Sequence, residues 1–282
     1  MFKKSIQMGE EQGIRYALGK VKFQSFALSV YCFEMDGVLF DTSSYSLRKQ
    51  MKPFFDAADI DQVVITHDHE DHTGGAAYIE RTKGIPIWMS EQSFENSLKK
   101  ANYPMYRKLF WGTRKPFNAQ PLGKTFESRT AVWDVIETPG HAYDHLSFLN
   151  RQTGHLFTGD LYVSPQTKVI LDTESIPTIL QSLNRVLALD FEEVVCHHAG
   201  IVKDGHVKLL QKKENIEQFI DQVLTLSSKG MDSQEIHQQL FPKKYPIIRF
   251  SSGQWDSMHM VTSVLNEQLL QNERGDQIGT RL

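Results

Sequence analysis

Apolar positions along the chain follow two different spacings, and their succession predicts an α/β fold. Residues 26–31 and 37–41 are short apolar runs separated by a turn, as in paired strands. Residues 61–66 form another buried strand, rich in β-branched side chains. Residues 75–83 have helical spacing, and residues 85–89 are again extended. Strands and helices in this order indicate a mixed α/β domain.

From residue 206 onward the spacing is helical throughout. Asp232 and Glu235 are suited to cap a short helix that ends before Pro242. Further helices are marked by apolar residues on one face, Ile216, Phe219, Ile220, Val223 and Leu224 in the first and Trp255, Met258, Val261 and Leu265 in the last. Helices this short are marginal alone, so these faces need a partner surface. We predict a domain over residues 1–205 with a helical region, 206–282, packed on it; homodimerisation through the same faces is the competing use.

Composition narrows the class of protein. The chain has 282 residues, of which 40% are apolar, enough for a full core. Its net charge of −3 gives no general attraction to nucleic acid or anionic lipid. Cys32 and Cys196 lie in apolar runs and are expected to be buried, reduced thiols. No apolar run is long enough for a membrane span, and residues 9–12 interrupt any signal peptide, so we expect a cytoplasmic protein without a membrane partner.

A dense group of metal-binding side chains follows the strand at residues 61–66. The stretch Thr-His-Asp-His-Glu-Asp-His-Thr-Gly-Gly, residues 66–75, holds three imidazoles and a carboxylate: His67, His69, Asp71 and His72. Alternation along an extended backbone places the first two on one face, and the turn brings the others round the same cavity. Four such side chains at this spacing indicate a metal site, and one loop could supply two ions. Glu70 is expected to point away as a surface charge.

Three further motifs follow, each after an apolar strand-like run. They are Thr-Pro-Gly-His ending at His141, Thr-Gly-Asp ending at Asp160, and Cys-His-His-Ala-Gly at residues 196–200. Each alone is a common turn sequence, but four motifs in this order are a strong signal. Together with His-x-His-x-Asp-His and its Gly-Gly, they resemble the metal motifs of the metallo-β-lactamase superfamily. The resemblance covers about residues 20–205.

The resemblance implies a four-layer αββα sandwich, here with a C-terminal helical appendage, and seven metal ligands. His67, His69 and His141 would hold a first ion, and Asp71, His72 and His198 a second. Asp160 would bridge the two ions. Nitrogen and oxygen donors suit two zinc ions, although iron or manganese would also be accepted because no thiolate enforces zinc.

The implied activity is that of a metal-dependent hydrolase. A hydroxide held between two metal ions would cleave an ester, thioester or lactone of a small molecule, with Asp71 both binding metal and orienting the hydroxide. No Gly-x-Ser-x-Gly elbow suggests a serine mechanism. The alternatives are a mononuclear iron enzyme that oxygenates sulfur compounds and a phosphodiesterase acting on nucleotides or RNA. A catalytically silent binding protein is disfavoured because all seven ligand positions are filled.

The last motif departs from the family, which usually has Gly-His-Gly where this chain has His-His-Ala. The match continues without a gap through residues 201–205 and aligns His198 with the ligand and His197 with the preceding glycine. We therefore assign the ligand to His198 and expect His197 beside the ligands or facing the substrate.

Other features separate this chain from several branches of the superfamily. The 38 positions from Asp160 to His198 leave no room for the domain that nucleases insert there. Secreted β-lactamases place a cysteine where this chain has Asp160, and flavodiiron proteins lack the histidine found here at position 69. The branch of glyoxalase II-like thioesterases and acyl-homoserine lactonases remains.

Residues 93–130, between the first two motifs, mix aromatic and basic side chains. The aromatic residues Tyr103, Tyr106, Phe110, Trp111 and Phe117 are interleaved with Lys99, Lys100, Arg107, Lys108, Arg114 and Lys115. Three uses fit: a lid or wall of the metal site, packing of a helix on the core, or contact with single-stranded nucleic acid. Packing of an amphipathic helix on the core explains the pattern more simply than nucleic-acid contact, and a lid or wall stays open, so a small-molecule substrate is expected as the partner rather than nucleic acid.

Overall fold

The structure, a computed structural model, describes residues 2–24 and 26–279, with side chains described as far as residue 270. The chain forms two compact units. The first comprises Met1–Thr138, Tyr143–Val163 and Asp190–His206, and the second comprises Pro139–Ala142, Ser164–Leu189 and Val207–Leu282. The helical C-terminal region therefore shares a unit with segments from within residues 1–205. How residues 206–282 pack on the catalytic domain stays a prediction.

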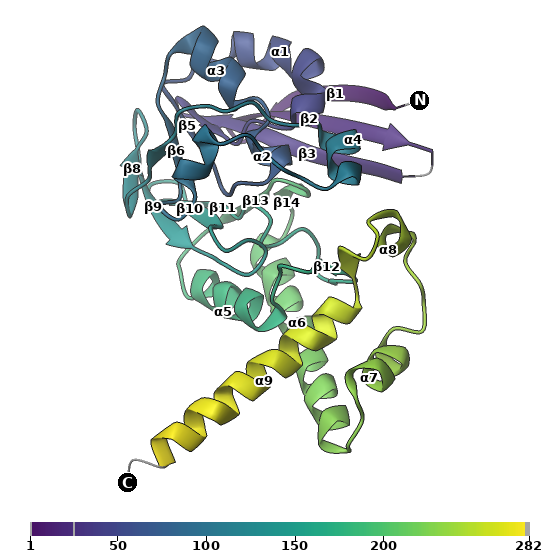
Figure 1. Ribbon diagram of the computed structural model, residues 1–282. Coiled ribbons are helices and arrows are strands. Elements are labelled where there is room, and N and C mark those ends of the chain that lie inside the picture. The colour runs from purple at the N-terminus through teal and green to yellow at the C-terminus, as the bar shows by residue number, and fades with distance from the viewer. Residues whose placement is uncertain (1, 25, 280–282) are drawn as a thin grey trace. The chain divides into compact units, whose positions relative to one another are not determined.

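A mixed sheet organises the first half of unit one. Within the described residues it has seven strands, in the order β1 (Lys3–Glu11), β2 (Ile14–Phe23), β3 (Phe26–Met35), β4 (Val38–Phe40), β5 (Gln62–Val64), β6 (Ile87–Met89) and β7 (Gln120–Pro121). Strands β1 to β4 pair antiparallel, and β4 to β7 pair parallel. Helices α1 (Arg48–Ala57) and α3 (Ala76–Lys83) lie along the outer face of the sheet (Figure 1). The predicted hairpin of residues 26–41 is confirmed as β3 and β4. The long hairpin β1–β2 was not predicted.

A second sheet follows in the same unit. Within the described residues its order is β14 (Gly200–Val202), β13 (Glu193–Cys196), β11 (His155–Phe157), β10 (Leu146–Asn150), β9 (Val132–Glu137) and β8 (Thr125–Glu127). Only β11 and β13 run parallel to each other; the other neighbours are antiparallel. Two mixed sheets with helices between their strands confirm the predicted α/β class.

Aromatic side chains from both sheets form the core between them. The ring of Phe40 on β4 stacks on Phe157 of β11 at 4.1 Å between centroids and lies 4.9 Å from Trp133 of β9. All three are fully buried. Burial of large apolar side chains is the main stabilising term in folding, so this contact fixes the two sheets against each other. Because β4 ends at Phe40 and β11 ends at Phe157, it also fixes where the loops after these two strands begin.

The second unit is mainly helical. It contains α5 (Ile176–Leu187), most of α6 (Gly205–Ser228), α7 (Ser233–Leu240), α8 (Pro246–Phe250) and α9 (Met258–Gly279). The predicted cap is confirmed, because Asp232 and Glu235 form a reciprocal capping box on α7. Trp255 was assigned wrongly to the last helix: it lies in β15 (Trp255–Asp256), which pairs with β12 (Ile170–Leu171). No helix among the described residues is long and apolar enough to cross a membrane.

Candidate metal centre

The loop after β5 carries the four predicted ligands of the first motif, two before a short helix and two within it. His69 is extended, and the short helix α2 (Glu70–Thr73) begins immediately after it. The backbone N–H groups of His72 and Thr73 both donate to the carbonyl of His69, at 3.1 Å each. His67 and His69 thus precede the turn, while Asp71 and His72 lie within it, as the sequence predicted.

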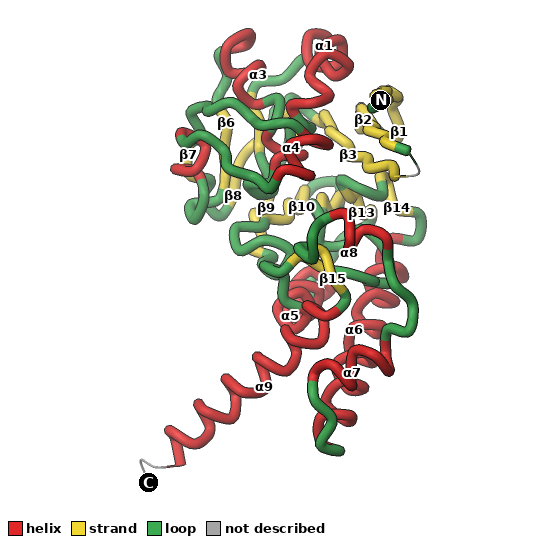
Figure 2. Tube along the Cα trace, turned by 45° about the vertical axis from the view of Figure 1, so that its right-hand side comes forward, coloured by secondary structure: helices red, strands yellow, loops and turns green. Residues whose placement is uncertain are grey.

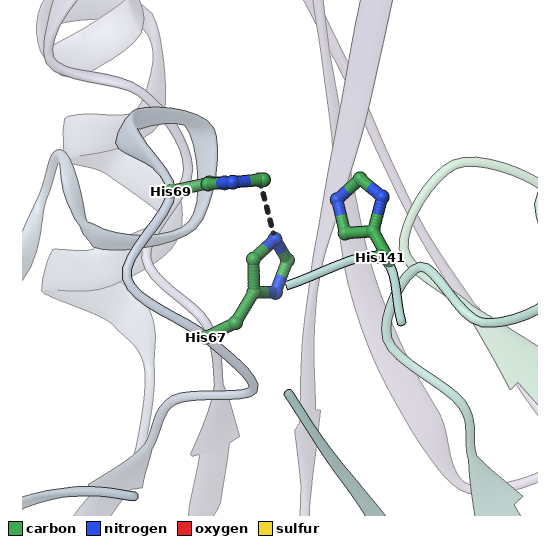
Figure 3. A group of neighbouring side chains, drawn as sticks. All are labelled: His67, His69 and His141. Atoms are coloured by element: carbon green, nitrogen blue, oxygen red, sulfur yellow. Dashed lines mark hydrogen bonds between the residues drawn. The ribbon is translucent and has the colours of Figure 1, made fainter. Parts of the chain in front are cut away.

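Three imidazoles form the first candidate ligand group. His67, His69 and His141 offer ring nitrogens that all lie within 4.8 Å of one another. Figure 3 shows the three rings turned toward one another, with Nε2 of His67 2.9 Å from Nδ1 of His69. His141 is also held from behind, because its Nδ1 lies 3.3 Å from a carboxylate oxygen of Glu174. This is the set assigned to the first ion.

A second group lies next to the first and contains two carboxylates. Asp71, His72 and His198 offer donor atoms within 4.8 Å of one another, and so do His67, His72 and Asp160. Oδ2 of Asp160 is 3.0 Å from Nε2 of His198 and 3.4 Å from Nε2 of His72. Asp160 therefore shares neighbours with both proposed ions. All seven predicted ligands fall into these groups, although their binding of metal stays a prediction.

The side chains of the two candidate groups are better satisfied by a bound cation than by hydrogen bonds to one another. Nε2 of His72 is fully buried and makes no hydrogen bond of good geometry, although Oδ2 of Asp160 lies 3.4 Å and Oδ1 of Asp71 3.9 Å away. Burial opposes charge on His198, yet the Asp160 carboxylate raises the pKa of its imidazole to about 9. A bound cation would accept the lone pair of the buried nitrogen. It would also neutralise the carboxylate charge that otherwise raises the pKa of the neighbouring imidazole. These residues therefore fit metal ions.

Asp41 orients two of the imidazoles, and sequence reasoning missed it. Its Oδ2 accepts from Nδ1–H of His72 at 2.6 Å and from the hydroxyl of Thr66 at 2.8 Å. Since that hydroxyl has one hydrogen and gives it to Asp41, it must accept from Nδ1–H of His67, 2.9 Å away. Nε2 of both His67 and His72 is thereby left with a lone pair for a metal.

The Asp41 carboxylate is held as an anion at the end of β4. Burial raises its pKa, but the His197 and His72 imidazoles outweigh this and the pKa lies below its ordinary value. Its backbone is left-handed, with φ +59°, a conformation that aspartate and asparagine tolerate better than most residues. The sequence did contain one sign of this role. Asp41 is a charged residue directly after the apolar strand β4, which pairs with β5 next to the first motif.

The second missed residue, His145, and the ambiguous His197 both lie behind the ligands. Nε2 of His145 accepts from the backbone N–H of Asp160 at 2.9 Å, which fixes the loop carrying the proposed bridge. His197 is fully buried, with Nε2 3.1 Å from Asp41, and joins none of the ligand groups among the described residues. His198 instead directs Nε2 at Asp160 while its Nδ1–H donates to the carbonyl of Ser29 at 2.6 Å.

The expectation that Glu70 is a surface charge was wrong. Its side chain is fully buried and accepts two hydrogen bonds from Arg107 of α4 (Met105–Trp111), at 2.5 and 2.6 Å. Alternation fails here because Glu70 begins a helix and does not continue a strand. A buried charge requires a partner, and an arginine supplies a bidentate one.

A second arginine fastens the same segment to the metal loop. Arg114, also buried, donates to Asp68 at 3.1 Å and to the backbone carbonyl of Asn96 at 2.8 Å. Residues 93–117 are thus tied to the metal loop by two ion pairs with little exposure. These ties favour a fixed wall over a mobile lid.

Comparisons with known proteins identify the family. The profile of the metallo-beta-lactamase superfamily matches residues 28–198. A crystal structure of a metallo-beta-lactamase family protein from Thermus thermophilus superposes with a TM-score of 0.66 at 19% identity, over 93% of this chain and 95% of that one. The chain belongs to the metallo-β-lactamase superfamily and has its αββα fold.

Curated relatives match this chain at low sequence identity. The chain is 25% identical to a probable metallo-hydrolase, YqjP, of Bacillus subtilis, over 67% of this chain and 70% of the relative. It is 27% identical to an atrochrysone carboxyl ACP thioesterase of Passalora fulva, over 59% of this chain and 44% of the relative. The latter alignment spans less than half of the thioesterase.

The first prediction concerns Asp41, and we expect Asp41→Asn to lower metal affinity about 10- to 100-fold. Asparagine tolerates the left-handed backbone. It carries no negative charge, however, so it no longer holds the proton of His67 and His72 on Nδ1. Metal affinity is measured by competition with a chromogenic chelator. Asp190→Asn, at an exposed position, is the matched control. Equal affinities in the two variants would show that Asp41 does not orient the ligands.

The second prediction separates the adjacent histidines. His198→Ala should remove one metal ion per chain, because it deletes a ring nitrogen that faces Asp71 and Asp160. His197→Ala should keep both ions and lower their affinity only modestly, since His197 contacts Asp41 and not the proposed ions. Elemental analysis after dialysis gives the metal content of each variant. The opposite ranking would transfer the ligand role to His197.

Proposed function

We propose that the chain is a dinuclear metal-dependent hydrolase that cleaves an ester, thioester or lactone of a small molecule. The observation that carries the proposal is the position of Asp160. Its carboxylate lies within hydrogen-bond or ion-pair distance of His72 from the first motif and His198 from the last, and it is almost completely buried. A buried carboxylate with histidines on both sides is the arrangement that two cations sharing a bridge require.

The metal ions and the protein have separate tasks in this proposal. Two bound cations would lower the pKa of a shared water to about 7, which would make hydroxide available at neutral pH. Asp71, with Oδ2 3.6 Å from Nε2 of His198, is placed to accept a hydrogen bond from the attacking water and so orient it. Behind them, Asp41 and His145 hold the histidines and the Asp160 loop in place.

Among carbonyl substrates, an acyl thioester fits the surroundings of the metal loop. The wall segment carries exposed apolar side chains, Leu98 on η2 (Phe94–Leu98) and Met105 and Leu109 on α4, beside the exposed Lys99 and Lys100. Apolar contacts suit an acyl chain and the lysines suit an anionic thiol carrier. A related protein named as a carrier-protein thioesterase supports the same class.

The third prediction tests the shared bridge. In Asp160→Ala the metal content should fall from two ions per chain to less than one, because the only ligand common to both ions is lost. Elemental analysis of the zinc-loaded protein gives the stoichiometry, with Asp172→Asn, on an exposed carboxylate, as the control. Retention of two tightly bound ions by Asp160→Ala would show that Asp160 is not the bridge.

The fourth prediction is that the zinc-loaded protein hydrolyses acyl thioesters at least about tenfold faster, in kcat/KM, than aryl phosphodiesters. Activity should disappear with a chelator and return with zinc. Paired Met105→Glu and Leu109→Glu changes should raise KM for an octanoyl thioester several-fold and leave KM for an acetyl thioester nearly unchanged. Thiol release is followed photometrically.

Two results would contradict this assignment. Faster cleavage of phosphodiesters would move the chain to the phosphodiesterase alternative. Purification with one iron per chain, together with oxygen consumption in the presence of a thiol or persulfide and no hydrolysis, would indicate the sulfur oxygenase.

A further inference from the structure

The first strand of the structure is a long edge with no partner on its outer side. Among the described residues β1 pairs only with β2, over nine consecutive residues without a bulge, and it forms the margin of the first sheet (Figure 2). None of its residues is buried, and it contains no proline. The opposite edge strand, β7, has only two residues and ends in Pro121. A long edge without such protection is a template for pairing with another strand.

The turn between β1 and β2 determines which backbone groups face outward. It contains two residues, Gln12 and Gly13, with φ of +51° and +75°, so Glu11 and Ile14 form the closing hydrogen-bonded pair. Hydrogen-bonded pairs then recur at every second residue along an antiparallel ladder. The odd-numbered residues of β1 therefore bond to β2. The N–H and C=O groups of Lys4, Ile6, Met8 and Glu10 point to the free edge.

The sequence of β1 is complementary to itself when it is read in the opposite direction. An antiparallel pair of β1 strands centred on Gln7 places Lys3 opposite Glu11, Lys4 opposite Glu10, and Ile6 opposite Met8. Directly opposed residues lie on the same face of a sheet, so both ends gain opposite-charge pairs and the middle gains an apolar one. Met8 is 54% exposed, and such a contact would cover it.

The same register satisfies the backbone. Centring on Gln7 pairs residue 6 with residue 8 and residue 4 with residue 10, which are the residues whose N–H and C=O groups face outward. Up to about eight hydrogen bonds would then join the two strands. A parallel arrangement in register would instead set lysine beside lysine and glutamate beside glutamate, which is unfavourable.

We propose that β1 is a dimerisation edge, at which a second copy of this chain adds its own β1 in antiparallel orientation centred on Gln7. The occupant is a second copy because the charge pattern matches itself end to end. The contact is small, and we expect a dissociation constant in about the micromolar range. This surface is distinct from the apolar helix faces beyond residue 206.

Charge reversal at the outermost pair tests the proposal on the full chain. Lys3 and Glu11 are both exposed, so Lys3→Glu and Glu11→Lys should leave the fold intact. Each change replaces two attractive pairs per dimer by two repulsive ones and should weaken homodimerisation about tenfold or more. An equimolar mixture of the two variants should form a heterodimer at least as stable as the wild-type dimer. Sedimentation velocity across a concentration series gives the dissociation constants.

A backbone variant provides an independent readout. Met8→Pro removes one outward N–H without touching the hydrogen bonds to β2, and should weaken the dimer about tenfold or more. Met8→Thr keeps the N–H and is the matched control; circular dichroism verifies that both are folded. A wild-type chain that stays monomeric at about 100 µM would overturn the proposal, since the expected affinity is micromolar. So would a dimer that none of the changes at positions 3, 8 and 11 weakens, because it would then use another surface.

Discussion

The carboxylate of Asp41 is the constraint on which the metal centre depends. It is fully buried, and its neighbours come from two places in the sequence: Thr66 and His72 in the first motif and His197 in the last. A buried anion is costly unless it is surrounded by donors, so the protein must bring these segments together to retain it. The same hydrogen bonds determine which nitrogen of His67 and His72 carries the proton. The fold that buries this carboxylate therefore also sets the protonation of the imidazoles proposed to bind metal.

Ion pairs of low exposure perform a similar task on the outer side of the metal loop. Glu70 and Asp68 alternate with the ligand histidines, and each receives an arginine from residues 93–117. Removing one partner of such a pair leaves a buried charge without compensation, which typically costs about 3–5 kcal/mol. The segment between the first two motifs is therefore held against the loop that it borders. A fixed wall can impose a substrate preference that a freely moving segment would not.

The residues that stabilise the fold and those that form the site lie in different parts of the chain. Aromatic packing of Phe40, Trp133 and Phe157 fixes the sheets, and the proposed ligands lie in loops that follow β5, β9, β11 and β13. A rigid core with irregular loops is the usual way to hold catalytic groups without burying unsatisfied backbone. Strand β2 adds Ile14 to the same core, whereas no residue of β1 is buried, so the outer edge of β1 is free for contact with a second chain.

The sequence by itself determined the α/β class and the local caps and predicted the ligand set, because each of these depends on neighbouring residues. Histidine spacing, strand-ending turns and the Asp232–Glu235 box all act over a few positions. Tertiary structure alone decided that Glu70 is buried, that Asp41 and His145 orient the ligands, and that His197 lies behind them. These roles depend on partners 15 to 156 positions away, such as Asp160 for His145 and Asp41 for His197. No periodicity reveals such contacts, because burial of a charge depends on what the fold places beside it.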